Sequence, residues 1–324
     1  MRDRQVLPDW PDLWLPIMKG SALNDSHPAF DRDAFLAEAR AIGEHPAFDQ
    51  AIARWANASL DTFEGRPRDA KLVCQTARYV TLFFILHLHA TADPRDPNSG
   101  ASVGRVQEQM TAGGFGSMGF VKLAIRTFDR TGLIEPLPPG PDRRLRRFRP
   151  SPYLIEIGRA ALTTSLETVA LVRPLPLPPA VLASTPGVVE NIARVTVDTY
   201  ERDRFTNLEI LPEITAFLQR DFGHLILSHL VRTMRPEANA FIAEAPAGDL
   251  AERFGMSRAH VRNVLAMASE MELLTVEGNA GRRICLSPDF VELCRQWVAI
   301  DLAWLLRLAI GALGHANAQR DVRS

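Results

Sequence analysis

The sequence predicts a mostly α-helical fold built around two copies of one unit, each with a three-helix core and a β-hairpin. The main evidence is a repeat, because Ser151-Pro-Tyr-Leu-Ile-Glu-Ile-Gly-Arg159 recurs as Ser287-Pro-Asp-Phe-Val-Glu-Leu-Cys-Arg295 with four identical positions. The same order of helical and strand patterns precedes both segments. Self-similarity of this kind is typical of a duplicated structural unit.

The correspondence continues upstream of the repeat. Arg146-Arg147 aligns with Arg282-Arg283 at the same offset of 136 positions, and Ser117 aligns with Ser257 at an offset of 140. The smaller offset after the hairpin indicates a longer hairpin turn in the first copy.

The composition is that of an ordinary soluble protein, with 46% apolar and 23% charged residues. Three cysteines without metal-ligand spacing indicate a reducing compartment. The start, Met1-Arg-Asp-Arg-Gln, lacks the apolar stretch of a secretory signal. Of two apolar segments, Val80–Leu88 is too short to span a membrane, and Trp297–Leu313 is interrupted by charges. We therefore expect a cytoplasmic protein with no membrane span, metal or cofactor.

At 324 residues the chain is long enough for two domains with separate cores. Proline-rich residues 173–186 form a stiff linker near the middle. We expect an N-terminal half at 1–172, which comprises an irregular arm and a core at about 69–172. The C-terminal half, 187–324, has a core at about 208–290 and ends in a long helix.

Punctuation and periodicity place the elements in order. Prolines in a repeated His-Pro-Ala-Phe-Asp segment start the first two helices, and an Asp-Pro-Arg-Asp-Pro segment ends the third. Helices are predicted at about 28–42, 46–63, 69–90, 103–110, 117–131, 152–171, 187–202, 208–234, 237–244, 248–254, 257–271 and 289–316. Hairpins are predicted from 133 to 149 and from 273 to 286.

The clearest motif is Asp249–Leu265. Leu250 and Phe254 give its first helix an inner face, and Gly255 suits a left-handed exit from that helix. Ser257 then caps a second helix. This is the pattern of a helix-turn-helix, whose second helix enters the major groove of DNA.

The hairpin after each helix-turn-helix corresponds to a wing, and arginines on a wing can reach phosphates or a narrow minor groove. The first return strand, Arg143–Arg149, carries five arginines on both of its faces, which a half-buried strand would not tolerate. Residues 101–160 hold ten Lys and Arg against five Asp and Glu, whereas residues 246–296 hold six against seven. The first copy is therefore the expected main phosphate binder.

These patterns predict double-stranded DNA as the partner. The candidate contact residues of the first copy are Ser117, Met118, Lys122, Arg126, Arg143, Arg144, Arg146, Arg147 and Arg149. Those of the second copy are Ser257, Arg258, His260, Arg262, Arg282 and Arg283.

The Asp249–Leu265 motif, the Gly-Leu-Ile and Leu-Leu strand entries and the arginine-bearing hairpins resemble the winged helix-turn-helix fold of MarR-like bacterial transcription regulators. The resemblance covers about 60 residues in the first copy and 50 in the second. It implies a DNA-binding regulator. Such regulators usually work as dimers, whereas this chain carries two winged units itself and is expected to act as a built-in pseudo-dimer.

Other interpretations stay open at this point. Winged helices also serve as protein-interaction or scaffold modules without DNA. Gly114-Phe-Gly-Ser-Met-Gly119 matches a dinucleotide-binding pattern, but a predicted helix precedes it where a buried strand is needed. No catalytic spacing of side chains indicates an enzyme. The C-terminal helix is apolar almost all round, so it must be buried against the first half or in a homodimer. A small-molecule effector of unidentified class also stays open.

Overall fold

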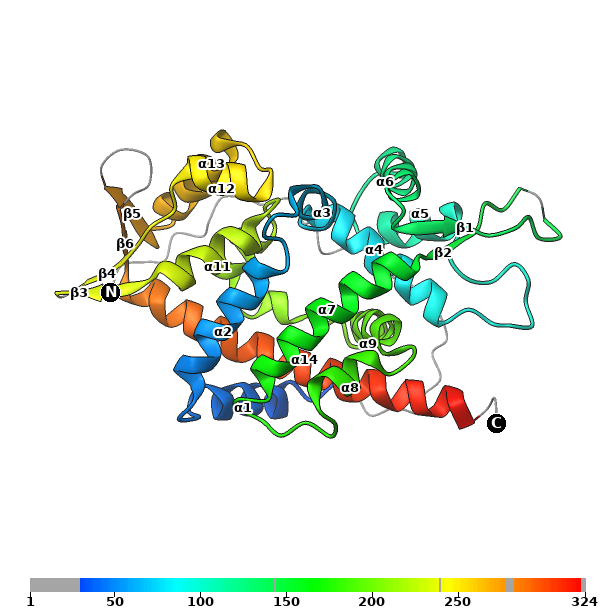
Figure 1. The fold of residues 1–324 in the computed structure, drawn as a ribbon, viewed down its shortest axis with the longest axis horizontal. Helices are drawn as coiled ribbons and strands as arrows, with labels where there is room; N and C mark the ends of the chain where they lie inside the picture. The colour runs from blue at the N-terminus through cyan, green and yellow to red at the C-terminus, as the bar shows by residue number, and fades with distance from the viewer. Residues whose placement is uncertain (1–29, 143, 239, 278–282, 322–324) are drawn as a thin grey trace.

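The computed structural model describes residues 30–142, 144–238, 240–277 and 283–321. It is mostly helical, with two small antiparallel sheets (Figure 1). The predicted N-terminal arm lies outside the described residues, as do Arg143 and the second hairpin tip with Arg282.

The first half consists of seven helices and one hairpin among the described residues. In chain order these are α1 (Arg32–Gly43), α2 (Phe48–Asp61), α3 (Pro67–Val73), α4 (Thr76–Ala90), α5 (Val103–Ala112), α6 (Met118–Arg130), β1 (Ile134–Pro136), β2 (Phe148–Pro150) and α7 (Pro152–Val169). We call α4 to β2 the first unit.

The second half repeats this order with three additions, the 3-10 turn η1 and the strands β3 and β4. Its elements are α8 (Pro179–Ser184), α9 (Val188–Asp203), η1 (Asn207–Glu209), α10 (Pro212–Leu218), α11 (Gly223–Thr233), β3 (Arg235–Glu237), β4 (Ala240–Ala243), α12 (Ala247–Phe254), α13 (Arg258–Glu270), β5 (Leu274–Glu277), β6 (Arg283–Leu286) and α14 (Pro288–Asp321). We call α11 to β6 the second unit.

Two predicted long helices are each broken in the structure. The helix predicted at 69–90 is divided into α3 and α4, and the one predicted at 208–234 is divided into η1, α10 and α11. The two breaks meet, because the Phe222 N–H donates to the Cys74 carbonyl at 2.7 Å. Phe222 has a left-handed φ of 59°, which ends helical continuity there. A contact between distant segments thus replaces helical hydrogen bonds.

The predicted helix at 237–244 is wrong, because β3 and β4 form a hairpin there. Strand β4 pairs antiparallel with β6 through Phe241 and Leu286, which gives the sheet order β3-β4-β6-β5. Ile242 is only 2% exposed. Periodicity alone cannot distinguish a strand from a helix in a short apolar run. Here the segment is a strand because it pairs with the edge of β6 that β5 leaves free. In the first unit a single bridge between Ser102 and Arg147 takes the place of β4.

The two halves exchange their leading helices. Helix α2 packs on α11 of the second unit, and α9 packs on α4 of the first. In the same reciprocal way α1 packs on α14 and α8 packs on α7, while α7 and α14 contact each other. These reciprocal contacts are those of a two-fold symmetric dimer made within one chain.

The hydrophobic cores follow this exchange. The largest core joins Phe35 of α1 and Trp55 of α2 to residues of α11, α13 and α14. The first unit's core includes Ala193 and Val197 of α9. Each core therefore contains residues from both sides of the proline-rich segment at 173–186.

Helix α14 is the long apolar helix that the sequence predicts. Within the described chain, Pro288–Ala318 is the one segment whose length and hydropathy would suffice to cross a membrane, and 56% of its most apolar window is buried in the protein. It packs against α1, α7 and α9, so both halves cover it.

Candidate nucleic-acid interface

Helices α6 and α13 begin at equivalent serine caps. The Ser117 Oγ accepts from the Phe120 N–H at 3.2 Å. The Ser257 Oγ accepts from the His260 N–H at 3.0 Å. The predicted caps are confirmed, and α6 and α13 start at the same point of the repeat.

The turn before each helix uses a left-handed glycine. Gly255 follows α12 with a φ of 72°, and Met256 then lies buried beneath the turn. Gly114, the second residue after α5, has a φ of 69°; this turn spans residues 113–117 and is two residues longer than the turn at 255–257. Since helix α5 precedes Gly114, the glycine-rich segment lacks the strand that a dinucleotide site needs.

The outer face of α6 is basic. Val121, Ala124, Ile125 and Phe128 are buried on its inner face. Lys122, Arg126 and Arg130 recur every four residues on the opposite side, and all three are exposed. Met118 and Leu123 add apolar surface there, with 60% and 54% exposure.

The outer face of α13 differs in part from the prediction. Arg258 and Arg262 are exposed as expected. His260 is half-buried, because its Nε2 contacts the Asp221 carbonyl and its ring lies beside Phe222. Its side chain therefore supports α13 from inside the protein.

Asn263 and Arg130 are exposed on these helices and were not in the predicted set. Asn263 lies on α13 next to Arg262, at the position equivalent to Leu123. An amide there has the donor and acceptor that recognise adenine in the major groove. Arg130 extends the basic stripe of α6 by one turn. Helical periodicity in the sequence places both residues on the outer faces of their helices, so it could have identified them.

The arginines of the β1–β2 hairpin, the first predicted wing, have different surroundings. Arg149 is paired with Glu135 at 2.9 Å. The Arg147 guanidinium donates to the carbonyls of Pro97 and Pro138, so it fastens two loops together.

Two arginines of this wing have no such contact. Arg144 and Arg146 are exposed, and neither side chain makes an ion pair with the described residues. Their charges are therefore exposed to solvent and not compensated by an ion pair with the described residues.

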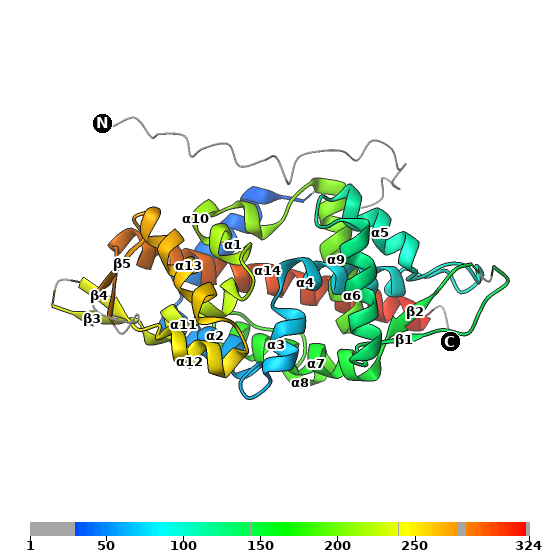
Figure 2. The same ribbon diagram turned by 90° about the horizontal axis from the view of Figure 1, so that it is seen from above.

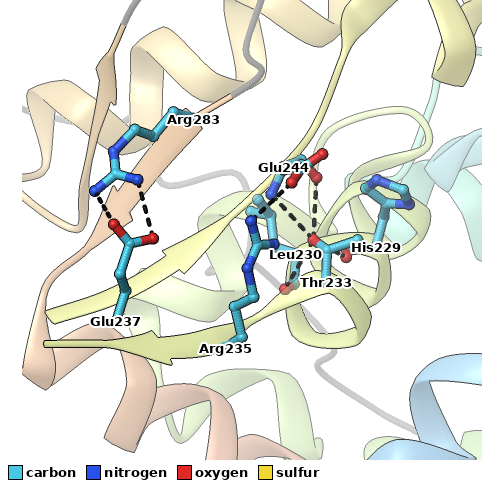
Figure 3. Close-up of polar contacts among 7 residues, drawn as sticks. All are labelled: His229, Leu230, Thr233, Arg235, Glu237, Glu244 and Arg283. Carbon is cyan, nitrogen blue, oxygen red and sulfur yellow. Dashed lines mark hydrogen bonds and ion pairs between the residues drawn. The ribbon is translucent and has the colours of Figure 1, made fainter.

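Arg283, the described arginine of the second predicted wing, is paired with two carboxylates, one of which is drawn in Figure 3. Arg283 binds Glu237 through two nitrogen atoms, at 2.8 and 3.0 Å. Its Nε also donates to Glu277 at 2.9 Å. Hydrogen bonds to Glu237 and Glu277 raise the pKa of Arg283. The Arg283 guanidinium lowers the pKa of Glu237, while the Cys285 thiol and Arg283 lower that of Glu277.

Strand β3 carries Glu237 into this position because the β3–β4 hairpin is fastened at its base. The Thr233 Oγ1 donates to the Glu244 carbonyl at 3.0 Å and accepts from the Glu244 N–H at 3.2 Å (Figure 3). Arg235 also pairs with the Glu244 carboxylate at 2.9 Å. The first unit has no hairpin at this point among its described residues.

Helices α6 and α13 lie along the same face of the molecule. They occupy its upper side in Figure 1, with the β1–β2 hairpin and the β5–β6 hairpin at opposite ends of the long axis. Figure 2, seen from above, shows both helices on the near side with α3 between them. One elongated surface therefore includes both α6 and α13.

Other kinds of site have less support. Among the described residues, no group of three or more His, Cys, Asp or Glu side chains is placed to hold a metal ion. A cavity of about 530 Å³ between α2, α7 and α8 is open to solvent and lined by both polar and apolar residues, including Gln50, Asn57 and Leu171.

Comparisons with protein-family models, with curated protein sequences and with solved structures give no significant match to this chain.

Proposed function

We propose that this protein is a cytoplasmic DNA-binding transcription regulator whose two winged helix-turn-helix units act as the two protomers of a pseudo-dimer. The observation that carries the proposal is the shared face of α6 and α13. Figure 2 shows the two helices on that face. Both start at equivalent serine caps and carry exposed cationic residues.

In this proposal the outer faces of α6 and α13 enter successive major grooves of one duplex. Lys122, Arg126 and Arg130 would contact phosphates or guanine edges, and Asn263 would contact adenine. Arg144 and Arg146 on the first wing would add phosphate contacts beside the groove. The net charge of the whole chain is −1, so the attraction comes from this face rather than from the whole protein.

The two units would contribute unequally. The first wing offers unpaired cations, whereas Arg283 of the second wing is held by Glu237 and Glu277. We infer that the first unit supplies most of the sequence-independent affinity and that the second acts mainly through α13.

A salt-titrated binding experiment tests the proposal. Fluorescence anisotropy on a random duplex of about 30 base pairs, or about three helical turns, would measure affinity against salt concentration. We expect R144Q/R146Q to lower the slope of log affinity against log salt by about 2, at about 0.9 per lost phosphate contact. The matched control is R32Q/R40Q, two exposed arginines of α1 on the opposite side of the molecule in Figure 1. Absence of wild-type binding at about 50 mM salt would refute the proposal, since electrostatic binding is strongest there.

A protein-interaction module without DNA binding is the second candidate. The exposed apolar pair Met118 and Leu123 on α6 favours it, as does the neutralised Arg283. That function would show no DNA binding at any salt concentration. The same titration therefore separates the two candidates.

A further inference from the structure

We propose that α3 is a third DNA-contacting element, a basic bridge that binds duplex phosphates between the two winged units. The basic bridge consists of Arg66, Arg68 and Lys71. This inference rests on the proposed function and extends it, because neither winged unit contains α3.

The bridge lies where a duplex spanning both units would pass. Helix α3 is on the same face as α6 and α13 and between them in both views (Figures 1 and 2). It contacts α12 of the second unit and α4 of the first. Ala70 is fully buried in the large core, and Leu72 is buried in the core of the first unit. Because both units hold α3, its side chains keep a fixed position relative to both.

The arginines of the bridge lie beside the turn between α12 and α13. Arg66 and Arg68 flank Pro67, which packs against Gly255. A Cβ added to Gly255 would lie 3.0 Å from the Pro67 Cβ and 3.1 Å from the Pro67 carbonyl oxygen. Glu64 pairs with Arg253 of α12 at 2.6 Å, which fixes the loop before α3. The two arginines are thus placed next to the N-terminal part of α13.

The positive charge of the bridge is only partly compensated locally, because its three cations outnumber the one carboxylate of α3. All three side chains are exposed, and within the described chain none of them makes an ion pair. The only carboxylate of α3, Asp69, accepts a hydrogen bond from the Tyr153 hydroxyl at 3.0 Å. Glu64, the nearest acidic residue before the helix, is occupied by Arg253.

The fold does not require these charges. Arg66 and Arg68 are at the start of α3, where cations oppose the helix dipole. The equivalent helix α10 has Glu213 in its first turn and no Lys or Arg. The bridge is therefore a feature of the first half alone. It brings positive charge to the second unit, whose own wing arginine Arg283 is neutralised.

The test compares R66Q/R68Q with the control R32Q/R40Q on the same random duplex of about 30 base pairs. We expect R66Q/R68Q to lower the salt slope by about 2, because two phosphate contacts are lost. The charge-preserving R66K/R68K should retain the slope, since phosphate attraction needs a cation and no particular shape. Thermal unfolding of each variant checks that the fold is intact, because the substituted side chains are exposed.

The outcomes separate the bridge from the proposed function. If wild type binds and R66Q/R68Q keeps the slope of the control, the bridge is refuted while the DNA-binding function stands. If R66K/R68K lowers the slope as much as R66Q/R68Q, the bridge is also refuted. Lysine keeps the positive charge, so a phosphate contact should have kept the slope of wild type. Failure of wild type to bind overturns both proposals.

Discussion

The contact between Pro67 and Gly255 leads to a quantitative prediction about stability. Gly255 and Gly132 both have left-handed backbones, with φ of 72° and 75°. Replacing either glycine with alanine places a Cβ in a conformation that costs an L-residue about 1–2 kcal/mol. The unfolded chain also loses freedom with alanine, which offsets about 0.4–1 kcal/mol of that cost.

The surroundings of the two glycines differ. A Cβ at Gly132 would meet no atom within 4 Å, so only the backbone cost applies there. A Cβ at Gly255 would lie 3.0 Å from one Pro67 atom and 3.1 Å from its carbonyl oxygen. Forcing these atoms apart adds about 1–3 kcal/mol, as for overpacked cores. We therefore expect Gly132→Ala to lower the free energy of unfolding by about 1 kcal/mol and Gly255→Ala by about 2–4 kcal/mol.

Urea unfolding followed by circular dichroism measures both values under one condition. Gly132→Ala is the matched control, because it changes the same residue type in the same backbone conformation. Equal destabilisation by the two substitutions would refute the reasoning. It would show that Pro67 moves aside freely and that the turn before α13 does not hold α3.

Two further predictions concern buried and paired carboxylates. Burial raises the pKa of Asp301 to about 6, although its carboxylate accepts a hydrogen bond from the Trp55 indole at 2.8 Å. Because this pKa exceeds the unfolded value, the free energy of unfolding falls as pH rises from about 4 to 6. Asp301→Asn should therefore stabilise the protein by about 1–3 kcal/mol at pH 7.5 and by little at pH 4. An equal gain in urea unfolding at both pH values would contradict this. The second prediction concerns Arg283, which E237Q/E277Q should release from its two carboxylate partners. The anisotropy titration should then show a salt slope of DNA binding that is steeper by about 1. An unchanged slope would show that Arg283 does not reach phosphate.

Local features of the fold were predictable from the sequence. The caps at Ser117 and Ser257 and the left-handed turn at Gly255 depend on neighbouring residues only. The same is true of the exposed positions on α6 and α13, because helical spacing alone separates Lys122 and Arg262 from the buried face.

Contacts between distant segments were not predictable in this way. The break at Cys74 depends on the N–H of Phe222, and the hairpin at 237–244 depends on the edge of β6. The same holds for the candidate interface. Sequence pattern marks Arg283 and His260 as available to DNA, but Glu237 and the Asp221 carbonyl come from elements that the repeat does not place beside them.

Joining two such units in one chain has a consequence for the proposed operator. In a homodimer the two DNA-binding surfaces are identical, so the half-sites mirror the two-fold symmetry of the protein. Here the surfaces differ, because α6 exposes Leu123 where α13 exposes Asn263, so the two proposed half-sites would meet different side chains. The unpaired cations also differ, with Arg144 and Arg146 on the first wing and the basic bridge beside the second unit. The reciprocal helix contacts hold the two units together, while the residues of each surface can vary independently. The proposed operator is therefore a pair of unlike half-sites rather than a palindrome.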